Sequence, residues 1–377
     1  MGRGQRKEGN RSVKIKRSSK CSLKFCNQKK LDTLKVVLGE YGKVVNFFIK
    51  RFWQGCPPKS KLLKGIVNLP DTWLTARLRK VAAREAIDMV QSSKRKKGSM
   101  PVHRGKRMCV SSTIASLIPS RNTSEFDAWL HLASIGNGII IDLPIKLHRH
   151  FHRWGDAGTR LESYIITDKN VQFSFEIVTE EKKSMGSLVG IDSGINALAS
   201  LSNGKQYGLD IRQGIERINR CQHGSKGQRK AVKALKQRID EVVKEIMEDE
   251  AIRLIVVEKL KDIKKKMKLK GRLSRNMRSV VYRWYYSYWL RRLQQATEIR
   301  RSSFRSVPAY YTSQECPACN LIDKRNRNGE LFLCRECGYT GNADITASKN
   351  ILNRFLTGKY GSCFKPSTSA QVDLSRI

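Results

Sequence analysis

Four cysteines in two closely spaced pairs constrain this chain more than any other feature of its sequence. Cys316 and Cys319 form one Cys-x-x-Cys pair, and Cys334 and Cys337 form a second, separated from the first by 14 residues. At this spacing two tight turns each present two thiolates to one tetrahedral Zn²⁺. Two redox motifs are the alternative, but such motifs seldom occur twice around one short polar loop. We therefore predict one structural zinc ion, whose four thiolates leave no position open for a substrate.

The remaining cysteines and the apolar pattern indicate the compartment. Of the ten cysteines, the six outside the two pairs are scattered along the sequence. This distribution favours metal binding in a reducing compartment over a disulfide framework. No apolar run approaches the roughly 20 residues of a spanning helix, and residues 1–20 lack the apolar stretch of a signal peptide. We therefore predict a cytoplasmic protein with no membrane partner.

The charge of the chain points to a polyanionic partner. The 377 residues include 74 Lys and Arg against 33 Asp and Glu, a formal net charge of +41. Repulsion of this size destabilises a folded protein unless anions neutralise it. A membrane surface is a competing polyanion, but no segment is apolar enough to enter one. Nucleic acid is therefore the predicted partner.

The first half of the chain is predicted to contain a helical unit followed by short strands. Apolar residues recur at helical spacing from Leu31 to Phe52 and again near Trp73 to Val90. The charged segment Ser92 to Gly98 ends this pattern. Extended pieces such as Gly138 to Pro144 and Tyr164 to Val178 then indicate strands of a small β unit.

The second half has an α/β order. A buried strand is expected at Leu188 to Asp192, followed by an antiparallel hairpin turning at Asn203-Gly204, with its last strand from Gln206 to Ile211. An amphipathic helix and a second buried strand, Leu254 to Val257, come next. A helix from about Val280 to Ala296 carries four aromatic residues, which we interpret as core packing in preference to a base-stacking platform. The amphipathic helix is marked by Val232, Leu235, Ile239, Val242, Val243 and Ile246.

Three carboxylates occupy positions that suit metal binding. Asp192 and Glu258 each close an apolar strand, where side chains of α/β sheets reach the functional crevice. Asp344 opens the helix carrying Ala347 and Ile351, where a capping role is the alternative. Acidic groups in so basic a chain would otherwise pair with Lys or Arg. A hard divalent cation is the other way to neutralise them.

Several of these motifs, taken in order, resemble one protein family. They are Gly190-Ile191-Asp192-Ser193-Gly194, Val257-Glu258-Lys259-Leu260, Tyr311-Thr312-Ser313-Gln314-Glu315-Cys316-Pro317-Ala318-Cys319, and Asp344 with Ala347, Asn350 and Ile351. The order of two carboxylates, zinc ribbon and third carboxylate is similar to that of TnpB, the transposon-encoded RNA-guided nucleases related to compact type V CRISPR effectors. The match covers Leu188 to Ile351. Within the third motif, Thr346 and Ser348 stand where the family commonly has Asn and Ala.

The resemblance implies a multidomain α/β fold containing a nuclease domain of RNase H-like (RuvC) type that is split in sequence. Its two parts are residues 187–315 and 338–377, and the zinc ribbon, residues 316–337, is inserted between them. By order and composition alone, residues 31–100 resemble the family's helical recognition lobe, and residues 1–30 with 101–186 resemble its β wedge domain, which is of the oligonucleotide-binding kind.

The resemblance also implies an activity, its cofactors and its partners. Asp192, Glu258 and Asp344 would be the catalytic positions of a metal-dependent endodeoxyribonuclease, and two Mg²⁺ (or Mn²⁺) would support hydrolysis of the phosphodiester bond. A guide RNA would select target DNA by base pairing, and double-stranded DNA would be unwound as it pairs. The expected origin is prokaryotic or phage. Transposon and CRISPR contexts both remain open.

Two other functions remain as alternatives, and one basic tract is a candidate nucleic-acid contact. A guided DNA-binding repressor without cleavage is the first alternative, although all three carboxylates are retained here. A transposase is the second, but a four-cysteine ribbon does not usually precede the last carboxylate of such enzymes. The tract after Glu258 is either a solvated loop or a guide for a strand near the metals. Its candidate contacts are Lys264, Lys265, Lys266, Lys268, Lys270, Arg272 and Arg275.

Overall fold

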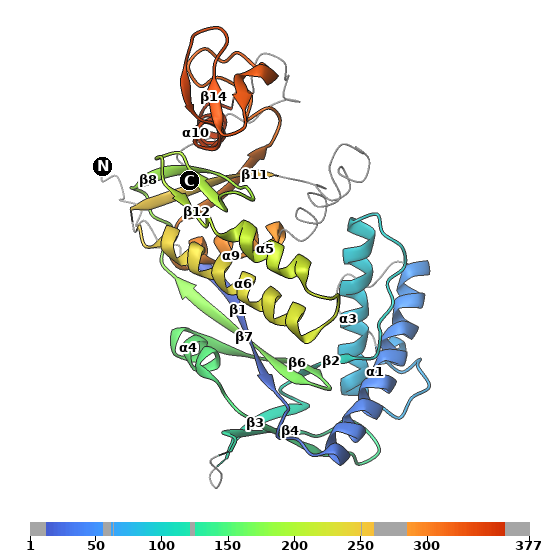
Figure 1. Ribbon diagram of the computed structural model, residues 1–377. Coiled ribbons are helices and arrows are strands. Elements are labelled where there is room, and N and C mark those ends of the chain that lie inside the picture. The colour runs from blue at the N-terminus through green and yellow to red at the C-terminus, as the bar shows by residue number, and fades with distance from the viewer. Residues whose placement is uncertain are drawn as a thin grey trace, which may run out of the picture. The chain divides into compact units, whose positions relative to one another are not determined.

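The computed structural model describes residues 13–55, 62, 64–120, 125–249, 251–259 and 285–358. Within this part the chain divides into two compact units, one of residues 13–178 and one that contains the described residues from Thr179 onward (Figure 1). Each unit is described by itself. Among the described helices, none combines the length and apolar character needed to cross a membrane.

Two long helices dominate one side of the first unit. Helix α1, Gln28–Gln54, is capped by Asn27, and α3, Ala76–Arg95, is capped by Thr75. The two helices pack on each other through apolar residues spaced three and four apart, as their amphipathic patterns predict. Both predicted helices are thus confirmed, and the short helix α2, Lys64–Val67, lies between them in sequence.

The strands of the first unit form two sheets. One has the order β1-β7-β6-β2 and the other the order β3-β4-β5. The stretch Tyr164 to Val178, expected as extended, is a hairpin whose strands meet at Asp168 and Lys169, because Thr167 accepts the hydrogen bonds that close the turn. Helices and strands of this unit contribute to a single hydrophobic core. The bounds are β1 Val13–Ser22, β2 Arg107–Ser111, β3 Ala115–Pro119, β4 Ala128–Leu132, β5 Ile141–Ile145, α4 Arg149–Ala157, β6 Thr159–Thr167 and β7 Asn170–Thr179.

A five-stranded sheet forms the centre of the second unit. Its order is β10-β9-β8-β11-β12. The neighbours β8, β11 and β12 run parallel, whereas β9 and β10 form the expected antiparallel meander with Gly204 at φ +92° in the turn. The bounds are β8 Ser187–Asp192, β9 Ala199–Leu201, β10 Gln206–Tyr207, β11 Ile252–Lys259 and β12 Ser303–Pro308.

Helices cover both faces of this sheet. The side chains of β11 point alternately to the two faces, so they pack into two separate cores. Ile255 and Val257 pack with α5, α6 and α9, whereas Leu254 and Val256 pack with α10. Helix α10 approaches β8 so closely that a Cβ on Gly190 would lie 2.1 Å from the Ser348 carbonyl oxygen. The bounds are α5 Ile211–Arg220, α6 Lys226–Met247, α9 Tyr286–Ile299 and α10 Ala343–Thr357.

One expectation for this unit was wrong. The last strand of the meander, predicted from Gln206 to Ile211, ends at Tyr207, and Ile211 instead begins α5. The left-handed Gly208, at φ +67°, redirects the chain after the strand. Ile211 and Ile215 are buried at helical spacing, so the apolar residues belong to a helix packed on α6. The predicted helix near Val280 to Ala296 is confirmed from Tyr286; residues 280–284 lie outside the described residues.

The cysteine segment lies between β12 and α10 and forms a small sheet of its own, β13-β14-β15. Both strand pairs in it are antiparallel. Phe332 packs with Cys316 and Cys334 in a small separate core, so the segment folds around its own sulfur atoms. The bounds are η1 Lys324–Asn326, β13 Arg327–Asn328, β14 Leu331–Leu333 and β15 Thr340–Asn342.

Candidate functional site

The four predicted zinc ligands converge. Their Sγ atoms all lie within 4.8 Å of one another; Cys316 is 3.6 Å from Cys337, and Cys319 is 3.5 Å from Cys334. These separations are far longer than a disulfide bond of about 2 Å and close to the spacing of about 3.8 Å expected for thiolates that share one tetrahedral Zn²⁺. The donor set and its geometry therefore fit a metal ion.

The local backbone also prepares these thiols for a metal. Burial would raise the pKa of Cys334, but backbone N–H groups of Cys337 and Glu336, together with neighbouring thiols, bring it down to about 7. Burial raises the pKa of Cys316 to about 12. One thiol is thus readily ionised while another keeps its proton, and a bound cation would favour ionisation of both.

The three predicted carboxylates belong to neighbouring elements of the second unit. Asp192 ends β8 and Glu258 lies next to the end of β11, and because these strands are parallel neighbours their carboxyl ends share one edge of the sheet. Asp344 lies in the first turn of α10, which packs against β8 and β11. Asn342, and not Asp344, caps this helix, accepting hydrogen bonds from two backbone N–H groups at 3.0 and 3.1 Å. The Asp344 side chain is therefore available for other contacts.

The carboxylates influence one another electrostatically. Burial, followed by the negative charges of Glu258 and Asp344, raises the pKa of Asp192 to about 8. Burial also raises the pKa of Glu258, against a hydrogen bond from Thr312 and the nearby guanidinium groups of Arg354 and Arg327. Among the described residues, the four cysteines form a group of possible metal ligands whose ligand atoms all lie within 4.8 Å of one another. Asp192, Glu258 and Asp344 do not form such a group, so their oxygens lie farther apart than the four sulfur atoms. Carboxylates on neighbouring elements whose ionisation is made costly by burial suit a hard divalent cation.

An arginine that the sequence did not single out lies at this site. Arg327, in β13 of the cysteine segment, donates from Nη2 to Asp344 Oδ1 at 2.7 Å and lowers the pKa of Asp192 and of Glu258. It lines an open cleft of about 480 Å³ together with Lys324. The cysteine segment thus brings positive charge to the carboxylates, and an anionic group such as a phosphate would find cations beside them. Nothing in the local sequence distinguishes Arg327 from its basic neighbours.

A buried polar network supports Glu258. Thr312 Oγ1 donates a hydrogen bond to Glu258 Oε1. Asn350 of α10 donates from Nδ2 to the carbonyl oxygens of Thr312, at 2.9 Å, and Glu315, at 2.7 Å. Arg354 donates from Nε to the Glu315 carboxylate at 3.0 Å. The motif that precedes the cysteines therefore ties the second carboxylate to the helix carrying the third.

Helix α9 contacts the backbone and neighbours of the first two carboxylates. The Tyr286 hydroxyl donates to the Glu258 carbonyl oxygen at 2.5 Å, and Trp289 Nε1 donates to Ser193 Oγ at 3.1 Å. Tyr286 and Trp289 are both buried. The core-packing interpretation was made for Trp284, Tyr285, Tyr288 and Trp289, and it is confirmed for Trp289. Tyr286 and Trp289 each also position a residue at or next to a carboxylate.

Both departures in the third motif lie inside the fold, and one of them is hydrogen-bonded within its own helix. Thr346 and Ser348 are both buried, and Ser348 Oγ donates to the Ile345 carbonyl oxygen at 2.7 Å. The polar substitution at Ser348 is therefore satisfied by its own helix. The predicted contacts of the basic tract, Lys264, Lys265, Lys266, Lys268, Lys270, Arg272 and Arg275, lie outside the described residues.

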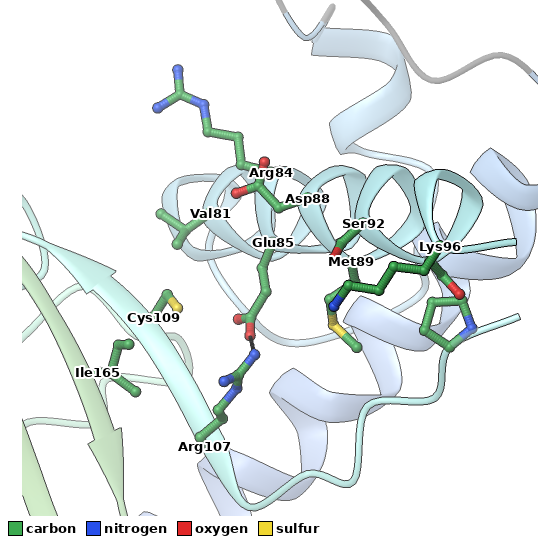
Figure 2. A pocket seen from close by; sticks show the side chains of 12 residues that line it. Val81, Arg84, Glu85, Asp88, Met89, Ser92, Lys96, Arg107, Cys109 and Ile165 are labelled. Carbon is green, nitrogen blue, oxygen red and sulfur yellow. Dashed lines mark ion pairs between the residues drawn. The ribbon is translucent and has the colours of Figure 1, made fainter. Parts of the chain in front are cut away.

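The first unit contains a cleft of its own. It has a volume of about 570 Å³ and lies between α3 and β2, with Glu85 directed toward Arg107 (Figure 2). Glu85 is buried, accepts a hydrogen bond from Tyr41 at 2.9 Å and forms an ion pair with Arg107 at 2.8 Å. Burial raises the pKa of Cys109 to about 12, so this thiol is not a reactive one. The acidic group is thus paired within the fold.

Comparison with known proteins identifies several similar chains. The sequence model of the Cas12f1-like, TNB domain family matches residues 286–351. The chain is 29% identical over 217 residues to the RNA-guided DNA endonuclease InsQ of Escherichia coli K12, covering 48% of this chain and 52% of InsQ. It is 50% identical over 46 residues to the CRISPR-associated endodeoxyribonuclease Cas12f1 of Sulfoacidibacillus thermotolerans, covering 12% and 11%. A TnpB-like protein of Aquifex aeolicus is 30% identical over 129 residues, covering 32% and 38%.

Two solved structures share the fold. The Cas12f1–sgRNA–target DNA complex aligns with a TM-score of 0.56 and 14% identity, covering 87% of this chain and 83% of that one. The mini-RNA-guided endonuclease CRISPR-Cas_phi3 aligns with a TM-score of 0.57 and 12% identity, covering 92% and 93%. The chain spans about half, or less, of the length of the curated relatives it matches. The predicted resemblance to TnpB-like compact RNA-guided nucleases is confirmed.

Proposed function

We propose that this TnpB-like chain is an RNA-guided DNA endonuclease whose active site consists of Asp192, Glu258 and Asp344. The observation that carries the proposal is the environment of Asp192, whose pKa is raised to about 8 by burial and then by the negative charges of Glu258 and Asp344. Buried carboxylates with raised pKa values, here Asp192 and Glu258, are typical of catalytic sites. The activities in the names of InsQ and Cas12f1 support the same choice.

The proposed fold of the catalytic part is the RuvC variant of the RNase H-like fold, residues 187–315 and 338–377. An antiparallel meander continuing into parallel strands, with helices on both faces, supports it. The separate core around the cysteines supports residues 316–337 as an inserted ribbon. We also propose residues 31–100 as the recognition lobe and residues 1–30 with 101–186 as the β wedge. One shared core joins the helices and strands of the first unit.

The proposed cofactors at the carboxylates are two Mg²⁺ or Mn²⁺ ions. Asp192, Glu258 and Asp344 supply the hard oxygen donors that such ions prefer. When bound, these ions supply an activated water and neutralise charge on the leaving oxygen of a phosphodiester. Thr312 holds one oxygen of Glu258 in a fixed direction, and Asn350 fixes the backbone of Thr312. The protein thereby keeps its donors in place before substrate arrives.

Positive side chains bind the phosphate and orient it in this mechanism. Arg327 and Lys324 line an open cleft, and Arg327 also reaches Asp344 at 2.7 Å. A planar guanidinium suits two oxygens of one phosphate. We propose that Arg327 attracts the scissile phosphate to the carboxylates, which would otherwise repel it.

The proposed zinc ion is structural. Four cysteine thiolates complete a tetrahedral coordination sphere, so the ion has no place for water or substrate. Its proposed task is to hold the ribbon, and through β13 to hold Arg327 beside Asp344.

The proposed partners are a guide RNA and a target DNA that unwinds as the guide pairs with it. The net charge of +41 supports polyanionic partners of this size. The proposed setting is the cytoplasm of a prokaryote or its phage, with a transposon as the genetic context and a compact CRISPR effector as the alternative. The competing function, a guided repressor, is disfavoured because a protein that only binds DNA has no use for three coupled carboxylates.

The test is cleavage of guide-matched DNA by protein purified with its coexpressed RNA. Asp192→Asn keeps the shape of the side chain and removes the charge, so it should abolish cleavage and leave binding of RNA and target intact. Asp156→Asn, an exposed position in the other unit, is the matched control and should cut like the wild type. Cleavage by Asp192→Asn at the wild-type rate would refute the assignment, and binding without cleavage by the wild type would favour the repressor.

A further inference from the structure

The hairpin of α5 and α6 carries a concentration of positive charge for which neither the catalytic site nor the basic tract accounts. From Arg217 to Gln237 the sequence has seven Lys and Arg and no Asp or Glu. The two helices pack side by side in the second unit, and this stretch forms the end at which they join (Figure 1). We call these seven residues the basic hairpin tip: Arg217, Arg220, Lys226, Arg229, Lys230, Lys233 and Lys236.

The cations of α6 lie along one face. Lys226, Arg229, Lys230, Lys233 and Lys236 are spaced three and four apart, so they follow one stripe of the helix. The opposite face holds the buried apolar residues of the core. The first four of these cations are exposed, and none makes an ion pair with any other described residue. The stripe therefore presents uncompensated charge to solvent.

This arrangement opposes the electrostatics of the helix itself. The N-terminus of a helix carries partial positive charge and favours acidic neighbours, yet the first turn of α6 has none. The acidic residues Asp240, Glu241 and Glu245 lie in its second half, where cations would be favoured. Ser225 caps the helix and accepts from Gln228 N at 3.0 Å, so the start is held by a neutral cap. Charge placed against the dipole costs the helix some stability, which a bound external anion would offset.

In the second half of α6, by contrast, charged side chains form ion pairs within the protein. Arg238 contacts Asp210 at 2.9 Å and Glu245 at 2.7 Å, and Asp240 accepts from Arg292 at 2.5 Å. Charges there are neutralised within the protein. The change from paired to unpaired charge within one helix marks the tip as a binding surface.

The aromatic rings beside the stripe favour a duplex over a single strand. An open cleft of about 480 Å³ lies between α6 and Tyr288. Lys236 lies 5.4 Å from the ring centres of Tyr285 and Tyr288, and Arg291 lies 5.5 Å from that of Tyr288. These rings hold cations over their faces, whereas single strands bind by stacking bases on free rings. Phosphate contact is therefore the main chemistry of this surface.

We infer that the basic hairpin tip binds the sugar–phosphate backbone of a double-helical part of the guide RNA. Lys226 to Lys236 spans about 15 Å along α6, a length that corresponds to about four phosphates of one duplex strand. RNA is favoured over DNA as the partner. Unpaired positive charge near the start of α6 destabilises the free protein at all times, and in the proposed function the guide RNA is the nucleic acid that stays bound. This inference rests on the proposed function for the identity of the RNA.

The experiment compares binding of a 20-base-pair RNA duplex by the full-length protein and by Arg229→Ala/Lys230→Ala/Lys233→Ala. Each phosphate contact contributes about 0.9 to the slope of log affinity against log salt, so the variant should lose about 2.7 of that slope. Between 50 and 200 mM salt the wild type should lose roughly forty times more affinity than the variant. The control Lys169→Ala/Lys205→Ala/Lys244→Ala removes the same charge from exposed positions elsewhere and should keep most of the slope.

Two further measurements separate the possible outcomes. The melting temperature of the free triple variant should equal or exceed that of the wild type, because alanine favours a helix and the removed cations opposed its dipole. A 20-base-pair DNA duplex and a single strand are measured in parallel. Equal slopes for the triple variant and the control overturn the inference, and so does a loss confined to DNA or to the single strand. Failure of the proposed nuclease leaves these binding slopes readable, since they require no cleavage.

Discussion

Thr312→Val tests whether the buried network holds Glu258 for catalysis. Thr312 is 3% exposed, and its hydroxyl donates to Glu258 Oε1. Valine has nearly the same shape and leaves the backbone carbonyl to accept from Asn350, so the change removes the hydroxyl alone. Glu258 would keep its position in the strand but lose the contact that directs one of its oxygens.

The size of the effect follows from that one hydrogen bond. A hydrogen bond to a charged group contributes about 1.5 to 3 kcal/mol. If all of it serves the transition state, cleavage should slow by roughly 10- to 150-fold. The Thr312 hydrogen bond also lowers the pKa of Glu258. Its loss raises that pKa further, so the carboxylate needs a higher pH to ionise, and the variant should lose most activity at low pH.

The assay is single-turnover cleavage of guide-matched DNA across a pH series, with melting temperatures recorded for each protein. Thr312→Ser keeps the hydroxyl and should restore most of the rate and the position of the acid limb. Cleavage by Thr312→Val that matches the wild type at every pH would refute the positioning role. A serine variant as slow as the valine variant would show that the methyl group, and not the hydrogen bond, matters.

Three further predictions concern the metals and the basic tract. Metal analysis should find about one Zn²⁺ per chain in the wild type, and Cys319→Ser/Cys334→Ser should lose it and melt at a lower temperature; full zinc occupancy in the variant would exclude the four-thiolate site. Because the pKa of Asp192 is raised from 3.8 to about 8, its ionisation costs the folded state stability as pH rises through that interval. The metal-free Asp192→Asn protein should therefore gain melting temperature relative to wild type from about pH 4 to about pH 8, and a difference independent of pH would contradict the burial of this charge. Replacing Lys264–Lys266 by alanine should make DNA cleavage less dependent on salt concentration. An unchanged salt dependence would show that the tract does not contact the DNA.

Local sequence patterns were enough to predict most helices and strands. The positions of Asp192 and Glu258 at the ends of apolar strands were enough to predict that these two carboxylates share one edge of the sheet. Helices α1, α3 and α6 have apolar residues at helical spacing on one face, so their cores follow from periodicity. Asp192 and Glu258 follow apolar runs, and parallel strands bring such ends to one edge. The cysteine pairs specify their own cluster, because ligand spacing fixes the turns.

Contacts between distant segments could not be read from the sequence. Arg327 is one basic residue among several in the ribbon, and only the fold of β13 brings it to Asp344, 17 positions away. Thr312 meets Glu258 across 54 positions. The helix α5 was missed because Gly208 ends the strand early, and a short apolar run after a turn fits a strand and a helix equally well.

The position of the ribbon in the chain has a structural reason. The segment entering it carries Thr312 and Glu315, and the segment leaving it continues through β15 into α10 and Asp344. Buried contacts of α10 with the entering segment, through Asn350 and Arg354, close this loop. Breaking a buried ion pair such as Glu315 with Arg354 costs about 3 to 5 kcal/mol, so the two segments are held together strongly. A cation bound by the four cysteines would therefore fix both ends at once, and the positions of the second and third carboxylates would then depend on a site that itself performs no chemistry.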